Sequence, residues 1–357
     1  MTRANGLKRS EKALSEVNAP GFAVEAEIAV QTGAVSSIAV SPDGTRLVVT
    51  KYGDDSVSVI DTGDGVVVHV VVDIDEPFAV AMSGKAGRTY IGSASAAYDS
   101  ILAFDTDADR VVASYPLAFS VTDLAVSPDG RYVYASRTAA DGADVAILDT
   151  TTGEQDSIGI AAVPGTAAQC VRVSPDGRRL YVGINGPFAA ELVVIDTRSN
   201  RVTSTIEIGS SIRDIALSAD GATIYVGSCG PDFGAVLDVV EGGTGAIAGT
   251  YKIGEIARGL TQLALSRDGR RAYLVGDTSV TVLSTATHDV IGNIVTGSRP
   301  SCITESPDGS RLYIADYAGP ITVLTTGSTT APVADELPTA PHQWALSNLL
   351  GLEPTLA

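Results

Sequence analysis

Apolar and polar residues alternate along short segments of this chain, and turn residues interrupt the alternation at regular intervals. Between residues 168 and 208, β-branched and apolar residues recur at every second position in four segments, 168–173, 179–184, 191–196 and 201–208. A period of two residues, bounded by glycine, proline and aspartate, is typical of β-strands. The pattern therefore predicts four short antiparallel strands joined as a meander.

The turn sequence Ser-Pro-Asp-Gly recurs through the chain. It starts at Ser41, Ser127, Ser174 and Ser306, changes by one residue at Ser218 and Ser266, and survives as a degenerate copy at Ser83. A second marker, Val-Ile-Asp-Thr, recurs in phase with it at 59–62, 103–106, 147–150 and 194–197, and in weaker form at 236–239, 282–285 and 323–326. Both markers return about every 45 residues, a period typical of repeat architectures. Proline supplies a fixed φ and glycine a free one, as a tight hairpin requires.

Seven such units without helical spacers predict an all-β fold, a seven-bladed β-propeller with four antiparallel strands in each blade. After the seventh Ser-Pro-Asp-Gly only three strands follow, at 301–305, 311–316 and 320–325, and a further strand at 24–30 precedes the first blade. We expect this N-terminal strand to complete the last blade and close the ring, which removes exposed strand edges. Residues 22–326 should then form one domain, preceded by a flexible arm at residues 1–21.

The combination of Ser-Pro-Asp-Gly, Leu-Tyr-Val and Val-Ile-Asp-Thr, seen for example at 174–182 and 194–197, resembles the repeats of bacterial YVTN-type seven-bladed β-propellers. The resemblance covers nearly the whole ring and implies the same fold. It implies no single activity, because that family consists mostly of binding proteins while similar propellers include lactonases and quinoprotein dehydrogenases.

The loops of a propeller divide between two rims. We call the rim formed by the Ser-Pro-Asp-Gly and Asp-Thr turns the turn rim, and the rim formed by the second-to-third strand loops and the connections between blades the loop rim. Loops on the loop rim are irregular, at 51–56, 93–100, 137–144, 184–190 and 228–234. Since recognition residues concentrate on variable loops held by a rigid scaffold, we expect the site on this rim.

Polar residues of the innermost strands point to a site at the mouth of the central channel. Four residues before each repeat serine the chain carries Ser37, Ala79, Asp123, Cys170, Asp214, Gln262 and Cys302. Arginines could bind an anion there through paired hydrogen bonds, whereas solvated channel lining would explain the same residues without a ligand. The predicted ligand-binding residues are Asp123, Arg172, Arg213, Asp214, Arg299 and Glu305.

Other candidates for chemistry are weaker. Cys170 and Cys302 share a repeat position three blades apart, too far for a disulfide, whereas we expect Cys229 to be more exposed. The Asp105-x-Asp107-x-Asp109 sequence lacks the glycine and the terminal glutamate of a calcium loop. We expect no metal site, no cofactor and no catalytic residues.

The C-terminal segment departs from the repeat. Residues 327–341 are rich in proline and threonine and predict a linker, and residues 342–357 predict a short amphipathic helix or tail. Its apolar residues could contact the ring or a protein partner. The predicted partner-binding residues are Trp344, Leu346, Leu349 and Leu350.

The charge balance excludes some partners. The chain of 357 residues has 24 basic and 42 acidic residues and a formal net charge of −18, which disfavours binding to nucleic acid or to an anionic membrane surface. No run of 18 apolar residues predicts a membrane span, and the N-terminal segment lacks the apolar core of a secretory signal. We therefore expect a cytoplasmic protein, with a mature secreted form, supplied without its signal, as the open alternative. We also expect a monomer.

Two functional hypotheses remain open. The first is a non-catalytic binding or scaffolding propeller that recognises a small polar ligand or a protein partner on the loop rim. The alternative is an enzyme, a lactonase-like hydrolase, a lyase or an isomerase, with its site at the channel mouth.

Overall fold

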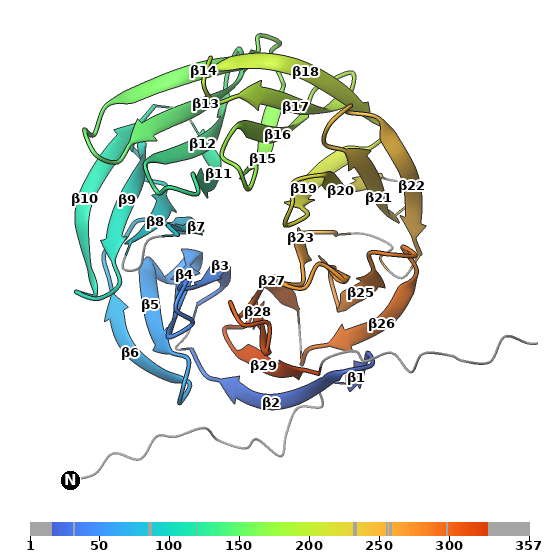
Figure 1. Ribbon diagram of the computed structural model, residues 1–357. Coiled ribbons are helices and arrows are strands. Elements are labelled where there is room, and N and C mark those ends of the chain that lie inside the picture. The colour runs from blue at the N-terminus through green and yellow to red at the C-terminus, as the bar shows by residue number, and fades with distance from the viewer. Residues whose placement is uncertain are drawn as a thin grey trace, which may run out of the picture. The chain divides into compact units, whose positions relative to one another are not determined.

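Seven antiparallel sheets, six of four strands and one of five, are arranged radially around a common centre (Figure 1). This computed structural model describes residues 16–30, 33–84, 88–118, 120–230, 234–254, 256, 259–297 and 299–327. The chain divides into a unit of residues 1–327, which contains the ring, and a second unit of residues 328–357. The fold confirms the predicted seven-bladed propeller.

Each of the first three blades follows the order of the chain from the centre outwards. Blade 1 contains β3 (Val35–Val40), β4 (Arg46–Lys51), β5 (Ser56–Asp61) and β6 (Val66–Val71), with the 3-10 helix η1 (Tyr52–Asp54) between β4 and β5. Blade 2 contains β7 (Pro77–Met82), β8 (Arg88–Ser93), β9 (Asp99–Asp105) and β10 (Arg110–Leu117). Blade 3 contains β11 (Ser120–Val126), β12 (Tyr132–Ala139), β13 (Gly142–Asp149) and β14 (Gln155–Ala161).

Blades 4 to 6 repeat this arrangement. Blade 4 contains β15 (Ala167–Val173), β16 (Arg179–Asn185), β17 (Ala190–Asp196) and β18 (Arg201–Ile208). Blade 5 contains β19 (Ser211–Leu217), β20 (Thr223–Gly230), β21 (Gly234–Glu241) and β22 (Ile247–Ile253). Blade 6 contains β23 (Gln262–Leu265), β24 (Arg271–Val275), β25 (Val280–Ser284) and β26 (Val290–Val295).

Blade 7 joins the two ends of the ring. Its inner strands are β27 (Pro300–Glu305), β28 (Arg311–Asp316) and β29 (Ile321–Thr326), and its outer strand is the N-terminal β2 (Phe22–Ile28), which pairs antiparallel with β29. The predicted closure is therefore correct. The ring begins earlier than expected, because β1 (Glu16–Asn18) pairs with β26 as a fifth strand of blade 6, within the segment expected to be a flexible arm.

The two sequence markers are joined by hydrogen bonds at the turn rim. In blade 4 the Ser174 hydroxyl donates to the Asp176 carboxylate at 2.6 Å and accepts from the Arg179 N–H at 2.9 Å. Gly177 adopts a φ of 70°, which favours glycine, and its carbonyl oxygen accepts from the Thr197 hydroxyl at 2.7 Å. The serine–aspartate bond recurs in the turns that start at Ser41, Ser127, Ser218, Ser266 and Ser306. The recurring motifs are thus explained by turn structure.

In blade 5 the second marker was placed three residues too early. Glu241 pairs with Thr223 in the register in which Asp61 pairs with Arg46, so the counterpart of Val-Ile-Asp-Thr is 239–242 and not 236–239. Asp238 is buried instead and accepts from the Thr250 hydroxyl at 2.5 Å. An aspartate preceded by two apolar residues was not sufficient to identify the turn.

The apolar core consists of seven clusters, each between two neighbouring blades. The cluster between blades 3 and 4, for example, includes Val145, Ile158, Val171 and Val182, all nearly inaccessible to solvent. Because each sheet is covered on both faces by its neighbours, the core forms a continuous ring around the centre. This leaves the inner strand edges to line the channel.

Candidate functional site

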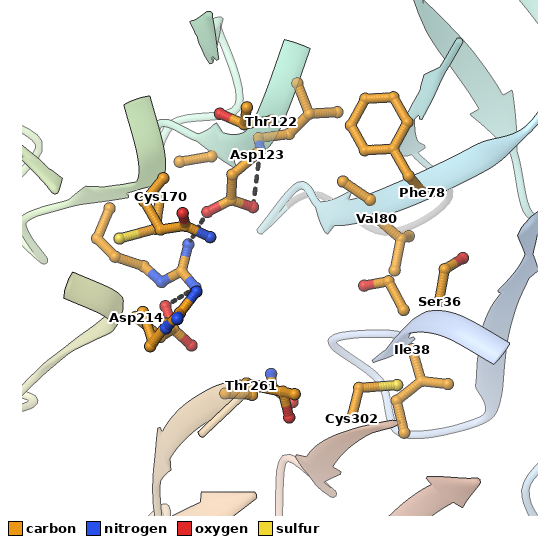
Figure 2. Close-up of a pocket in the computed structure, with 18 of the residues that line it drawn as sticks. Ser36, Ile38, Phe78, Val80, Thr122, Asp123, Cys170, Asp214, Thr261 and Cys302 are labelled. Carbon is orange, nitrogen blue, oxygen red and sulfur yellow. Dashed lines mark hydrogen bonds and ion pairs between the residues drawn. The ribbon is translucent and has the colours of Figure 1, made fainter. Parts of the chain in front are cut away.

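A cavity of about 470 Å³ lies at the channel mouth, and all seven blades contribute to it. Its walls include every residue four positions before a repeat serine, as expected for innermost strands that begin at the loop rim. They also include every residue five positions before, namely Ser36, Phe78, Thr122, Gln169, Arg213, Thr261 and Ser301. Figure 2 shows Asp123, Cys170 and Asp214 on one side of this cavity and Ser36, Ile38, Phe78 and Cys302 on the other.

A β-bulge explains why two consecutive residues of one strand reach the cavity. The pairing of β3 with β4 passes from Val35 to Ser37 and skips Ser36, and the same shift occurs in blades 2, 3, 4, 5 and 7. Strict alternation would have pointed these residues away from the channel, whereas a bulge re-aims a side chain. Of this set only Arg213 was predicted. Adjacent polar pairs such as Thr122-Asp123 and Ser301-Cys302, at one repeat position, were the signal that could have revealed the rest.

Polar side chains four positions before the serine connect neighbouring blades. Asp123 accepts from the Val171 N–H at 3.0 Å, Asp214 from the Leu263 N–H at 2.9 Å, and Gln262 from the Ile303 N–H at 2.7 Å. The three donors occupy one repeat position, three residues before the serine of the following blade. These bonds satisfy backbone groups that would otherwise be unpaired at the inner strand edge. The acidic residues of the channel therefore have a structural role.

Arg172 joins two of these carboxylates across three blades. Its guanidinium pairs with Asp123 and, at 2.5 Å, with Asp214, and its Nε donates to the Ile215 carbonyl oxygen at 3.0 Å. Burial raises the pKa of Asp214 to about 6, although the charge of Arg172 opposes the shift. Burial by itself lowers the pKa of Arg172, but attraction to Asp123 and Asp214 outweighs it and raises the pKa. Arg172 therefore stays charged, and its donors are mostly used within the protein.

Within the described chain, several hydrogen-bond donors in the cavity wall have no protein partner. Arg213 is exposed at the mouth, and within the described chain no carboxylate pairs with it. Gln169 of the neighbouring blade lines the same cavity, and the Gln262 amide nitrogen is free while its oxygen is bonded. By contrast, Ser36 and Thr122 are hydrogen-bonded to the second strands of their own blades. An incoming ligand thus meets unpaired N–H groups on blades 4, 5 and 6.

All three cysteines are buried and free. Cys170 and Cys302 line the cavity, as expected from their repeat position, and burial raises the pKa of Cys302 to about 12. The expectation of an exposed Cys229 was wrong, because only 9% of this residue is accessible at the end of β20. Thiolate chemistry is disfavoured at the two channel cysteines, since burial keeps them protonated.

Two predicted ligand-binding residues lie away from the cavity. Glu305 is at the opposite end of β27, about 10 Å further along the strand than Cys302. There it accepts from the Tyr273 hydroxyl at 3.2 Å and from the Arg267 N–H in a turn of blade 6. Arg299 lies on the loop rim, paired with Asp277 at 3.1 Å and stacked on Tyr317. The structure therefore places Arg299 and Glu305, both predicted to bind a ligand, outside the lining of the channel-mouth cavity.

The loop rim carries exposed aromatic side chains. The accessible fractions are 94% for Phe188, 54% for Tyr98, 46% for Tyr52 and 40% for Tyr317, and each residue lies in a loop between second and third strands. Aromatic residues are enriched in protein interfaces, so this rim is a candidate contact surface. The predicted partner-binding residues Trp344, Leu346, Leu349 and Leu350 lie outside the described residues.

Across the part of the chain that the structure describes, no three His, Cys, Asp or Glu side chains are grouped in a way that could hold a metal ion. Likewise, these residues contain no helix long and apolar enough to cross a membrane.

Comparison with known proteins supports the repeat assignment. The family model for the WD domain, G-beta repeat, matches residues 26–61. By structure, the chain is similar to Kuenenia stuttgartiensis hydrazine synthase, with a TM-score of 0.75 and 21% identity over 84% of this chain and 97% of that chain. At that identity the similarity concerns the fold alone.

One relative covers almost the entire length. The chain is 47% identical over 372 aligned positions to the seven-bladed beta-propeller protein Rv1057 of Mycobacterium tuberculosis (strain ATCC 25618 / H37Rv), and the match spans 95% of this chain and 94% of the relative. The chain therefore belongs to the family of seven-bladed β-propeller proteins that includes Rv1057.

Proposed function

We propose that this protein is a non-catalytic binding propeller that holds a small anionic ligand at the channel mouth. The observation that carries the proposal is the set of unpaired donors around one cavity, from Arg213, Gln169 and Gln262 on three consecutive blades. Guanidinium and amide groups bind carboxylate and other oxyanions through charge-assisted hydrogen bonds. The volume of about 470 Å³ suits a small molecule.

The state of the carboxylates favours binding over catalysis. A general base needs a lone pair that reaches the substrate, and Asp123 and Asp214 already accept from Arg172 and from backbone N–H groups. The cavity therefore presents hydrogen-bond donors to an anion. The two carboxylates among its lining residues, Asp123 and Asp214, are not free to act as a general base. The enzyme alternative would require Asp123 or Asp214 to leave Arg172 during turnover.

The test compares two arginines near the same rim. Small organic anions are screened by thermal shift, and the binders are titrated calorimetrically into the wild type, Arg213→Ala and Arg299→Ala. We expect Arg213→Ala to weaken binding at least tenfold, because a charge-assisted contact is lost. Arg299→Ala should leave binding unchanged, since Arg299 lies outside the cavity.

Equal affinity in the wild type and Arg213→Ala would contradict the proposal. Conversion of a binder during the titration would favour the enzyme alternative instead.

A protein partner on the loop rim is the second candidate function, favoured by the 94% exposure of Phe188. Large exposed aromatic side chains are frequent centres of binding energy. In-cell crosslinking with mass spectrometry should then detect partners whose crosslinks are lost in Phe188→Ser but kept in Val202→Ser, a substitution of an exposed residue on the outer strand β18. Identical crosslinks in both variants would exclude Phe188 as a contact.

A further inference from the structure

The ring contains the same type of groove twice, between blades 7 and 1 and between blades 4 and 5. Arg311 and Arg179 begin the second strands of blades 7 and 4 and pair in register with Thr325 and Asp196. Opposite them, the outermost strands β2 and β18 each have a bulge, whose unpaired residue is Glu25 in blade 7 and Thr203 in blade 4. The groove between blades 4 and 5 can therefore be compared, position by position, with the groove between blades 7 and 1.

In the groove between blades 7 and 1 a carboxylate fills the space beside the arginine. Arg311 binds Glu25 through Nε at 2.9 Å and Nη2 at 2.6 Å, and its Nη1 donates to the Thr62 carbonyl oxygen of blade 1 at 2.8 Å. This two-point contact is the preferred geometry of arginine with carboxylate. The remaining cavity is only about 20 Å³.

In the groove between blades 4 and 5 the carboxylate is missing. Arg179 is held as Arg311 is, because its Nη1 donates to the Gly242 carbonyl oxygen, the counterpart of Thr62. Thr203 replaces the glutamate, and its hydroxyl donates to the Val194 carbonyl oxygen at 3.2 Å. No carboxylate of the described chain pairs with Arg179, and the cavity beside it is about 330 Å³.

We propose that the groove between blades 4 and 5 binds the carboxylate of a small organic acid at the place that Glu25 occupies between blades 7 and 1. The acid's two oxygens accept from Nε and Nη2 of Arg179, the atoms that bind Glu25 in Arg311. Val194, Ile206 and Ile224 form an apolar part of the wall, so a short hydrocarbon tail is accommodated next to the carboxylate.

Two carboxylates line the groove beside Arg179, and both are hydrogen-bonded within their own turns. Asp196 accepts from the Ser199 backbone and side chain, and Glu241 accepts from the Thr244 hydroxyl. Arg198 lies two residues after Asp196 in the turn, and Arg201 is paired with Asp196 in the register of β17 and β18. Arg179 is the basic residue among those that line the groove, against these two carboxylates, and Arg198 and Arg201 add positive charge beside Asp196.

The test uses hexanoate as the probe and hexanol as its uncharged counterpart. Sodium hexanoate is titrated at constant ionic strength, and side-chain Nε–Hε signals are followed in ¹⁵N-arginine-labelled protein. We expect a saturable shift of the Arg179 signal towards the position of the Arg311 signal, and no such shift with hexanol. A response to hexanol equal to that to hexanoate would overturn the proposal, because the groove would then recognise only the tail.

Two substitutions on one strand separate occupation of the groove from a change of net charge. Thr203→Glu restores the internal carboxylate and should reduce hexanoate affinity at least tenfold, as measured by calorimetry. Thr205→Glu adds the same charge to β18 at a residue outside the groove lining, and should change the affinity less than threefold.

Unchanged affinity in Thr203→Glu, with its fold verified by circular dichroism, would also overturn the proposal. Arg179→Gln should lose binding as Thr203→Glu does, whereas Arg213→Ala should retain it. This site and the channel-mouth site can therefore fail independently.

Discussion

The innermost strand of each blade starts at the channel mouth and ends at a repeat serine, and these two ends use polar side chains differently. At the turn, Ser174, Asp176 and Thr197 bond to groups of their own blade. At the mouth, Asp123 and Asp214 bond to backbone groups of the following blade, and Arg213 bonds to no carboxylate among the residues that the structure describes. These turn bonds therefore stabilise one blade, whereas the bonds at the mouth hold blades together and leave donors for a ligand.

This difference shows that a polar residue near the channel is not by itself a sign of a site. Asp214 and Arg213 are adjacent in sequence and line the same cavity, yet all the acceptor oxygens of Asp214 are used by the protein. A polar residue that is hydrogen-bonded within the protein has a structural role, whereas one without a protein partner is available to bind a ligand.

The largest expected effect comes from breaking the mouth network. Asp214→Ala should lower the free energy of unfolding by about 3 kcal/mol, because Arg172 loses one of two counter-ions and the Leu263 N–H is left unpaired. Asp214→Asn keeps an acceptor for that N–H and should cost less. Urea denaturation measures both, and a loss below about 0.5 kcal/mol in Asp214→Ala would contradict a structural role.

A turn substitution should have a smaller effect. Ser174→Ala removes the acceptor of the Arg179 N–H and the donor to Asp176, so we expect a loss of about 1–2 kcal/mol in the same measurement. Ser204→Ala, at an exposed serine on β18, is the matched control and should change stability by less than about 0.5 kcal/mol. Equal losses in the two variants would mean that the serine–aspartate turn adds no stability.

A carboxyl group at the turn and one at the mouth should also differ widely in pKa. The hydrogen bond from Ser306 is the main reason that the pKa of Asp308 falls to about 2, whereas burial raises the pKa of Asp214 to about 6. The contribution of Asp308 is therefore present above about pH 4 and lost as the pH falls towards 2. That of Asp214 is present below about pH 4 and lost as the pH rises through 6.

Carboxyl ¹³C shifts followed from pH 1.5 to 8 measure both midpoints. Ser306→Ala should move the Asp308 midpoint towards 4 and leave that of Asp214 unchanged. If both carboxyls of the wild type titrate with a midpoint near 4, the expected difference in pKa between Asp308 and Asp214 is wrong.

The smallest effect on stability is expected at Arg213. Arg213→Ala should change the free energy of unfolding by less than about 0.5 kcal/mol, because no carboxylate in the described part of the chain pairs with its guanidinium. If urea denaturation shows that the substitution lowers the free energy of unfolding by more than about 1 kcal/mol, Arg213 has a structural role.

Strand positions could be predicted well because their signals are local. In blade 4 the predicted segments 168–173, 179–184, 191–196 and 201–208 lie within one residue of β15 to β18 at either end. The site could be predicted only in part. Asp123, Arg172, Arg213 and Asp214 line the cavity, but Arg299 and Glu305 do not. Counting residues from the repeat serine gave their positions along the chain without showing how far each side chain lies from the mouth.

By itself, the sequence determined the seven blades, their order and the closing strand, since turn chemistry and a two-residue period are properties of neighbouring residues. The tertiary structure decided which polar groups remain free. The bulge brings Gln169 and Arg213 into the channel, and Arg311 finds Glu25 across 286 positions of chain while Arg179 faces Thr203. The sequence around an arginine does not reveal a counter-ion that lies on a distant strand. Only the assembled ring therefore shows which charged group remains available to a ligand.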